Sequence, residues 1–251
     1  MGELLRWFVL LPLAGVAFAV TALFLTHLPR STAPLPDRPR LRPTDLLLAA
    51  LLFLLGARVG RDTAAAVLGP PWDSVLPGPA GLLAVLLALF LLGHRPVWFA
   101  PRPPRQPWSW TLRVAFAALP ALVAAALLQD AVLSSFGIPG PPSLPTGLEA
   151  SVANLAPYVL LAVVLAPCLE EAVFRGFLFQ GLAAPDRLGR VRALLFSSLL
   201  FAALHPLSLF LPTFVLGAVC AWARWQGGDL RHAIGLHALY NGAVVGAAAV
   251  L

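Results

Sequence analysis

The sequence contains no lysine and has few charged residues of any kind. Charged residues make up 11% of its 251 positions, and the 17 basic residues, all arginine, outnumber 11 acidic ones. Soluble domains carry about 25% charged residues, so this scarcity excludes an ordinary soluble domain. Because 59% of the residues are hydrophobic and the mean hydropathy is +0.85, we expect an all-α bundle of membrane-spanning helices.

The sequence also lacks several motifs, and their absence excludes some classes of function. The two cysteines, Cys168 and Cys220, lie in apolar segments and lack the spacing of a disulfide framework or a metal site. We interpret Cys168 as a buried apolar residue rather than a nucleophile. No glycine-rich phosphate loop follows a strand pattern, which argues against a nucleotide-driven machine. The net charge of +6 does not indicate a nucleic-acid partner, because the arginines are spread over short loops, as topology signals are in membrane proteins.

Apolar stretches of spanning length recur along the whole chain. We predict about eight spans, over residues 4–28, 46–59, 79–92, 108–128, 152–180, 193–209, 213–223 and 230–251. Thr44 and Asp45 precede the second span as a helix start does. Gly56 and Gly60 within it have the spacing that allows two helices to approach closely. The fifth stretch is longer than a bilayer requires, so we expect it to be tilted or to break at Pro167.

Arginines gather in four of the connections between these stretches. The groups are Arg30, Arg38, Arg40 and Arg42; Arg95, Arg102 and Arg105; Arg187, Arg190 and Arg192; and Arg224 and Arg231. Basic loops stay on the cytoplasmic side, so both termini are predicted to lie outside. We expect a multi-pass protein of a bacterial inner membrane, with membrane lipid around it.

Three ionisable residues interrupt the fifth stretch, at Glu170, Glu171 and Arg175. A charge at the bilayer centre costs about 2.5–3.5 kcal/mol on insertion scales, and such residues are functional by default. Glu171 and Arg175 are four residues apart and can pair along a helix, so a purely structural ion pair is one interpretation. Glu170 lies about 100° round the helix from Glu171, so the two carboxylates need not share a role.

A few polar residues in later stretches are candidate partners for these carboxylates. His205 lies in the sixth stretch, and His237 and Asn241 share one face of the eighth. A carboxylate beside an imidazole can take a proton from water, and a second imidazole and a carboxamide can donate to an oxyanion. Glu170, His205 and His237 are also a ligand set for zinc, although the His-Glu-x-x-His signature is absent. His205 can instead be an ordinary packed histidine, and His237 and Asn241 can simply hydrogen-bond to neighbouring helices.

These motifs, taken in order, carry a family resemblance. Glu-Glu-x-x-x-Arg at 170–175, Phe-x-x-x-His at 201–205 and His-x-x-x-Asn at 237–241 resemble the CPBP family of intramembrane proteases, which includes the type II CAAX prenyl endopeptidases and the bacterial Abi proteins. The resemblance covers about the last hundred residues. It implies that residues 151–251 are a catalytic helical core and that residues 1–150 hold four N-terminal spans.

The resemblance also implies a role for each motif residue. Glu170 would activate water with His205, while His237 and Asn241 would form the oxyanion hole. Accessory roles would fall to Glu171, Arg175 and Phe201. The glutamate mechanism requires no cofactor, and zinc is the alternative. If this division of roles holds, Glu170 rather than Glu171 should lie nearest both histidines.

The implied substrate is a peptide or protein that is membrane-associated or lipidated. Two rival functions stay open. One is a non-proteolytic scaffold or bacteriocin-immunity-type protein that keeps the motif residues. The other is a proton-coupled transporter, which also uses buried Glu and His but is typically built from two repeated halves; no such repeat is visible here.

Overall fold

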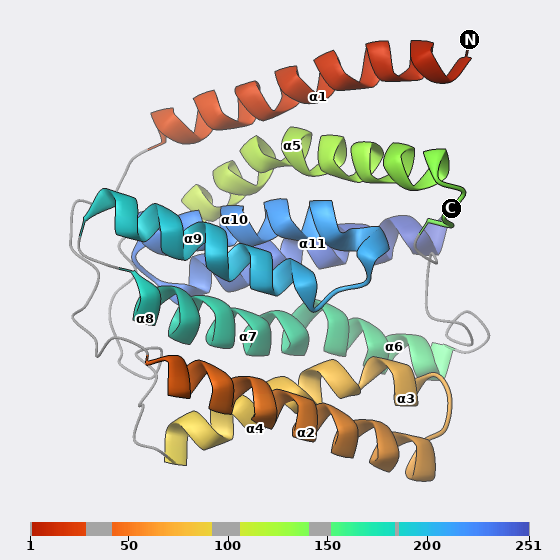
Figure 1. Cartoon of the computed structure of the whole chain (residues 1–251), viewed down its shortest axis with the longest axis vertical. Coiled ribbons are helices and arrows are strands. Elements are labelled where there is room, and N and C mark those ends of the chain that lie inside the picture. The colour runs from red at the N-terminus through yellow and green to blue at the C-terminus, as the bar shows by residue number, and fades with distance from the viewer. Residues whose placement is uncertain (1, 29–41, 92–105, 141–151, 184–185, 251) are drawn as a thin grey trace.

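The computed structural model describes residues 2–28, 42–91, 106–140, 152–183 and 186–250, and these residues form helices and connections without a strand (Figure 1). The all-α prediction is confirmed. The first helices are α1 (Gly2–His27), α2 (Pro43–Val67), α3 (Trp72–Val75), α4 (Pro77–Leu91) and α5 (Trp108–Ser135). The helices lie side by side, and the N- and C-terminal ends of the chain lie at the same edge of the bundle.

The second half begins with one long helical run and ends with three further helices. The run consists of α6 (Val152–Leu160), η2 (Leu161–Leu165), α7 (Ala166–Glu171), η3 (Ala172–Leu178) and α8 (Phe179–Leu182). It is followed by α9 (Arg187–Ala203), the short 3₁₀ turn η4 (Leu207–Leu209), α10 (Phe210–Gly227) and α11 (Leu230–Val250).

Each of the eight predicted stretches overlaps a helix or a continuous helical run. Within the described residues, four segments are long and apolar enough to cross a membrane: Val9–His27, Trp108–Ser135, Leu155–Leu182 and Leu207–Gly227. Pro77–Leu91 is a shorter apolar helix. The arginine groups at 30–40 and 95–105, on which the orientation depends, lie outside the described residues, so the orientation stays a prediction.

Several predicted boundaries are wrong. The fourth stretch continues to Ser135 rather than ending at Leu128, and the sixth begins at Arg187 rather than Ala193. Arg224, predicted in a loop, is buried within α10.

The second stretch continues as a helix to Val67 rather than ending near Val59. The sixth was predicted to run to Leu209, but α9 ends at Ala203. The next two backbone N–H groups, those of Leu204 and His205, bond to carbonyls three residues back, and Pro206 has no N–H with which to continue the helix. His205 therefore lies in a turn and not inside a span.

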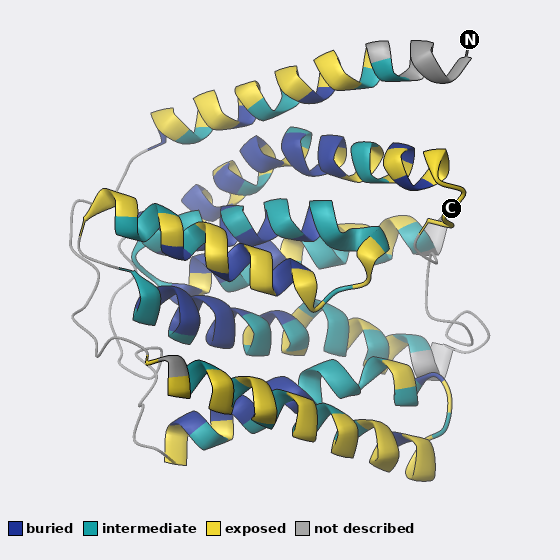
Figure 2. Cartoon of the chain, in the orientation of Figure 1, coloured by how far each residue is buried: buried dark blue, intermediate teal, exposed yellow. Residues whose placement is uncertain are grey.

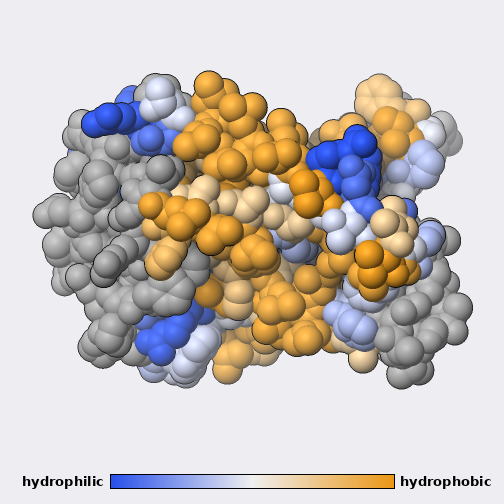
Figure 3. Space-filling view, turned by 90° about the horizontal axis from the view of Figure 1, so that it is seen from below, coloured by the Kyte–Doolittle hydropathy of each residue, from blue (hydrophilic) through white to orange (hydrophobic). Residues whose placement is uncertain are grey.

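The surface on the side of α2 and α4 has an apolar band between hydrophilic edges (Figure 3). Several aliphatic side chains of α2 are more than half exposed: Leu47, Leu51, Leu54, Leu55 and Val59. This surface suits the hydrocarbon of a bilayer. Figure 2 shows the complementary pattern, since α1 and α2 are largely exposed while the central helices are buried.

Helices α2 and α4 pack closely at Gly56 and Gly60, whose spacing allows such an approach. A Cβ atom at Gly56 would lie 2.6 Å from the Cβ of Ala84, and one at Gly60 would lie 2.5 Å from the Cβ of Ala80. Only glycine permits this approach at both positions. The start of α2 is stabilised at Asp45, whose Oδ2 accepts from the backbone N–H of Arg42 at 2.8 Å.

The long run from Val152 to Leu182 is not broken at Pro167 but is wound more widely on both sides of it. The η2 and η3 segments are π-helical, with backbone bonds between residues five apart: Ala166 N–H to the Leu161 carbonyl and Phe179 N–H to the Phe174 carbonyl. Such local π-helical turns are frequent at functional sites. Glu170 and Glu171 lie between the two.

One hydrophobic core joins the two predicted domains. It includes Leu82 and Val85 of α4, Val114 of α5, Phe174 of η3 and Phe201 of α9. The division near residue 150 therefore stays a prediction about sequence regions, while the packing is continuous across it.

Candidate active site

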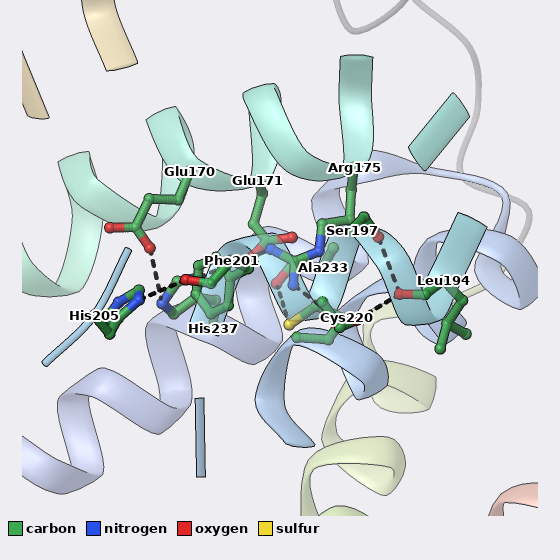
Figure 4. A network of polar contacts seen from close by, with 12 residues as sticks. Glu170, Glu171, Arg175, Leu194, Ser197, Phe201, His205, Cys220, Ala233 and His237 are labelled. Atoms are coloured by element: carbon green, nitrogen blue, oxygen red, sulfur yellow. Dashed lines mark hydrogen bonds and ion pairs between the residues drawn. The ribbon is translucent and has the colours of Figure 1, made fainter. Parts of the chain in front are cut away.

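Glu171 and Arg175 form a fully buried ion pair. Arg175 Nη1 donates to Glu171 Oε1 at 2.7 Å, and both side chains are 0% exposed (Figure 4). Arg175 Nη2 donates to the Gly217 carbonyl of α10 at 2.9 Å, and its guanidinium carbon lies 4.5 Å from the centre of the Phe201 ring. A Cβ at Gly217 would lie 3.0 Å from that Nη2. The predicted pairing is confirmed, and the pair also ties η3 to α9 and α10.

His237 lies between the two carboxylates. Its Nδ1 is 2.9 Å from Glu171 Oε1, and its Nε2 is 3.5 Å from Glu170 Oε2. The prediction that Glu170 lies nearest both histidines is therefore wrong for His237. The His237 side chain is 2% exposed and that of Glu170 is 16% exposed. Because the Glu171 oxygen already accepts from Arg175, it is held as an acceptor and fixes the proton of His237 on Nδ1.

His205 is oriented by its own helix end. Its Nδ1 is 2.8 Å from the Phe201 carbonyl oxygen. A carbonyl only accepts, so Nδ1 carries the proton and Nε2 of the neutral ring is an acceptor. The His205 ring packs on the Phe201 ring, with 4.7 Å between the ring centres. Figure 4 shows His205 at the Glu170 side of the network, away from Arg175.

Asn241 is held by the backbone of the long helical run. Its Nδ2 donates to the Ala162 carbonyl at 2.8 Å. The opposite amide orientation would bring two oxygens together, so the nitrogen must face Ala162. His237 and Asn241 were predicted to share one face of the helix that is now α11. Both contact the same helical run, His237 at Glu171 and Asn241 at Ala162.

A cavity of about 430 Å³ brings several of these groups to a common surface. Glu170, His205 and Asn241 all line it. His237 and Glu171 do not belong to the lining and lie behind Glu170. The opposite wall comes from α2, α3 and α4 and is mainly apolar: Phe53, Ser74, Val75, Gly78, Pro79 and Leu82. The cavity is therefore a pocket with a polar wall and an apolar wall, a combination typical of substrate sites.

The comparisons with known proteins agree with the geometry. Residues 152–243 match the family model described as type II CAAX prenyl endopeptidase Rce1-like. These residues form an Rce1-like region. The matched segment contains all three motifs, so the resemblance to the CPBP family is confirmed there. No curated protein and no solved structure matches the chain.

The Rce1-like region and the four apolar helices make this an integral membrane protein. At the level of the family, the match supports a CAAX-type intramembrane protease. The apolar wall of the cavity, at residues 53–82, lies outside the Rce1-like region.

Glu170, His205 and His237 do not fit a zinc ion as they lie here. Within the part of the chain that the structure describes, no three His, Cys, Asp or Glu side chains are grouped as a metal site requires. Nδ1 of each histidine bonds within the protein, that of His205 to the Phe201 carbonyl and that of His237 to Glu171. Zinc at these residues stays a prediction, and no step below depends on it.

The two cysteines are free, and they differ in environment. Cys220 is buried, whereas Cys168 is exposed, so the interpretation of Cys168 as a buried residue is wrong. Its side chain is not part of the cavity lining.

Sequence reasoning missed the groups that act through the backbone or come from distant helices. The carbonyls of Gly217 and Ala162 hold Arg175 and Asn241, yet neither residue type indicates a polar role. Phe53, Val75 and Leu82 complete the cavity, and nothing in their local pattern separates them from other apolar residues. The sequence indicates such a carbonyl only through Pro167, because a proline inside a spanning helix leaves a carbonyl without its donor.

Proposed function

We propose that this protein is an intramembrane endopeptidase that hydrolyses a peptide bond with water activated by Glu170 and His205. The observation that carries the proposal is the common cavity of Glu170, His205 and Asn241. It offers two proton acceptors, the Glu170 carboxylate and His205 Nε2, and one amide donor. No serine or cysteine nucleophile is needed when a carboxylate can deprotonate water directly.

The steps follow from these groups. Glu170, assisted by His205, accepts a proton as the water oxygen bonds to the substrate carbonyl carbon. The carbonyl oxygen gains negative charge, and the second N–H of Asn241, which is not used by Ala162, donates to it. The tetrahedral intermediate then breaks its C–N bond, and the proton held by Glu170 or His205 passes to the leaving amine.

His237 has a different role in this proposal from the one the family resemblance implies. Its buried position supports holding Glu170 in place rather than contacting substrate, since Nε2 faces Glu170 Oε2 and Nδ1 is fixed by Glu171. The approach of Nε2 to Oε2, at 3.5 Å, would keep the carboxylate aimed at the cavity. The oxyanion hole would then depend on Asn241, with any second donor coming from outside these residues.

The apolar wall suits a substrate with apolar side chains beside the scissile bond. Phe53, Val75 and Leu82 face the catalytic groups across the cavity, as a membrane-embedded or lipidated peptide would require. We infer a lipidated or membrane-associated protein substrate from the CAAX-type family together with this wall. By the resemblance to the bacterial Abi proteins, we place the protein in a bacterial inner membrane.

The test uses the protein reconstituted in phospholipid vesicles and two matched peptide libraries, one with a prenylated C-terminal cysteine and one with free cysteine. Mass spectrometry detects cleavage by wild type, Glu170→Gln and Cys168→Ser. We expect cleavage by wild type and Cys168→Ser only. Equal cleavage by Glu170→Gln would overturn the assignment. Cleavage of neither library by wild type, with a cellular phenotype that Glu170→Gln retains, would favour the scaffold.

A further inference from the structure

The carbonyl that holds Asn241 lacks a partner within its own helix. In η2 the backbone bonds join residues five apart, and the Ala166 N–H bonds to the Leu161 carbonyl. Ala166 is the residue that would serve Ala162 in an ordinary α-helix, so the Ala162 carbonyl loses its usual donor.

The next donor in the wider register is also missing. Five residues beyond Ala162 stands Pro167, which has no backbone N–H. The π-helical turn thus takes the N–H of residue 166 away from the Ala162 carbonyl, and the proline at position 167 has no N–H to replace it. A carbonyl orphaned inside a spanning helix is costly unless another group satisfies it, and Asn241 Nδ2 does so at 2.8 Å.

We infer that Pro167 is a positioning residue for the active site, because it keeps the Ala162 carbonyl free for Asn241. This inference rests on the proposed function where it concerns catalysis, but the coupling of the two residues does not. The Asn241 amide has two N–H groups. When one is fixed on Ala162, the amide plane is set and the other N–H has a defined direction. Asn241 also lines the cavity, so the direction of this second N–H decides whether it can donate to an oxyanion of the substrate.

Replacing Pro167 by alanine should release Asn241. The new N–H at position 167 can bond to Ala162 in the wider register. Alternatively, the segment can return to the α register, in which Ala166 bonds to Ala162 and position 167 to Val163. Either way the Ala162 carbonyl gains a backbone donor and Asn241 loses an exclusive acceptor. The helix itself is expected to keep its stability, since alanine is the better helix former.

A double-mutant cycle tests this directly, using thermal unfolding of the detergent-solubilised full chain. The variants are Pro167→Ala, Asn241→Ala and the two combined, with Pro120→Ala as the matched control, a proline inside α5. We expect Asn241→Ala to lower the melting temperature clearly in the wild-type and Pro120→Ala backgrounds, but much less in the Pro167→Ala background. An equal loss in all three would overturn the inference.

Kinetics supply the second measurement, with a peptide that the wild type cleaves. Pro167→Ala should lower kcat about 10- to 100-fold, as small misplacements of catalytic groups do, with KM changed less than about twofold. Unchanged kcat would contradict the inference. Pro167→Ser, which also restores an N–H, replaces the alanine variant if that variant does not fold. An inactive wild type would overturn the proposed function. The thermal cycle needs no activity, so it would still show whether Pro167 and Asn241 are coupled.

Discussion

His237 Nδ1 lies 2.9 Å from Glu171 Oε1, closer than its Nε2 lies to Glu170. The same Glu171 oxygen accepts from Arg175 at 2.7 Å. Glu171 is therefore the central acceptor of a buried network that joins α7, η3 and α11. Glu170, one residue earlier, is the carboxylate at the cavity. The two adjacent glutamates thus have different roles: Glu171 holds the helices together and Glu170 faces the cavity.

Removing one charge of the buried pair should destabilise the fold strongly. Arg175→Met leaves Glu171 charged and without its guanidinium, and breaking a buried pair in this way costs about 3–5 kcal/mol. The double variant Glu171→Gln/Arg175→Met removes both charges and should recover much of that loss. Thermal unfolding in detergent measures both. If the double variant is as unstable as Arg175→Met, the network does not stabilise through charge pairing.

Replacing His205 should reduce activity without unfolding the protein. His205→Asn removes the Nε2 acceptor from a turn that is only partly buried, and loss of a general base lowers kcat about 10²–10⁴-fold. His232→Gln is the matched control, since His232 is buried against Trp110 and bonds to Thr111 at 2.7 Å, remote from the cavity lining. That variant should lose stability while its remaining folded fraction keeps its turnover. If His205→Asn keeps its turnover and His232→Gln loses it, His205 has no role in the mechanism.

Metal removal should leave the proposed peptidase active. Within the residues that the structure describes, Glu170, His205 and His237 are not grouped as a metal site, so we expect cleavage without zinc. The measurement is cleavage after dialysis against 1,10-phenanthroline, with metal content determined on the same sample. Loss of cleavage that added zinc restores would show that the site rearranges around a metal.

The apolar wall should set which substrates enter. Val75→Trp adds an aromatic ring to the cavity surface, so peptides with bulky residues at the scissile bond should show a raised KM, while kcat for small ones changes little. Val59→Trp makes the same change on the exposed face of α2 and serves as the control. Equal KM changes for both variants, or none for either, would mean that α3 does not contact substrate.

Local sequence signals account for much of the fold and part of the site. The pairing of Glu171 with Arg175 depends only on helical spacing, and the close packing of α2 on α4 depends on Gly56 and Gly60, so both were predictable. The turn at His205 was also within reach, because the following Pro206 disfavours helix at that point.

The remaining features depend on how distant helices dock. Which glutamate meets His237 is set by the axial offset between α7 and α11, and periodicity along one helix carries no information about such an offset. The apolar wall from α2, α3 and α4 is likewise a product of packing. The acceptor for Asn241 is a backbone carbonyl, which residue types cannot reveal except through Pro167.

The most direct measurement of the central claim compares protein termini by mass spectrometry in cells that carry wild type, Glu170→Gln or Cys168→Ser at equal abundance. A water-activating role for Glu170 predicts at least one membrane-protein terminus that appears with wild type and Cys168→Ser and is lost with Glu170→Gln. Termini that are identical in all three strains would contradict the assignment of this protein as a Glu170-dependent peptidase.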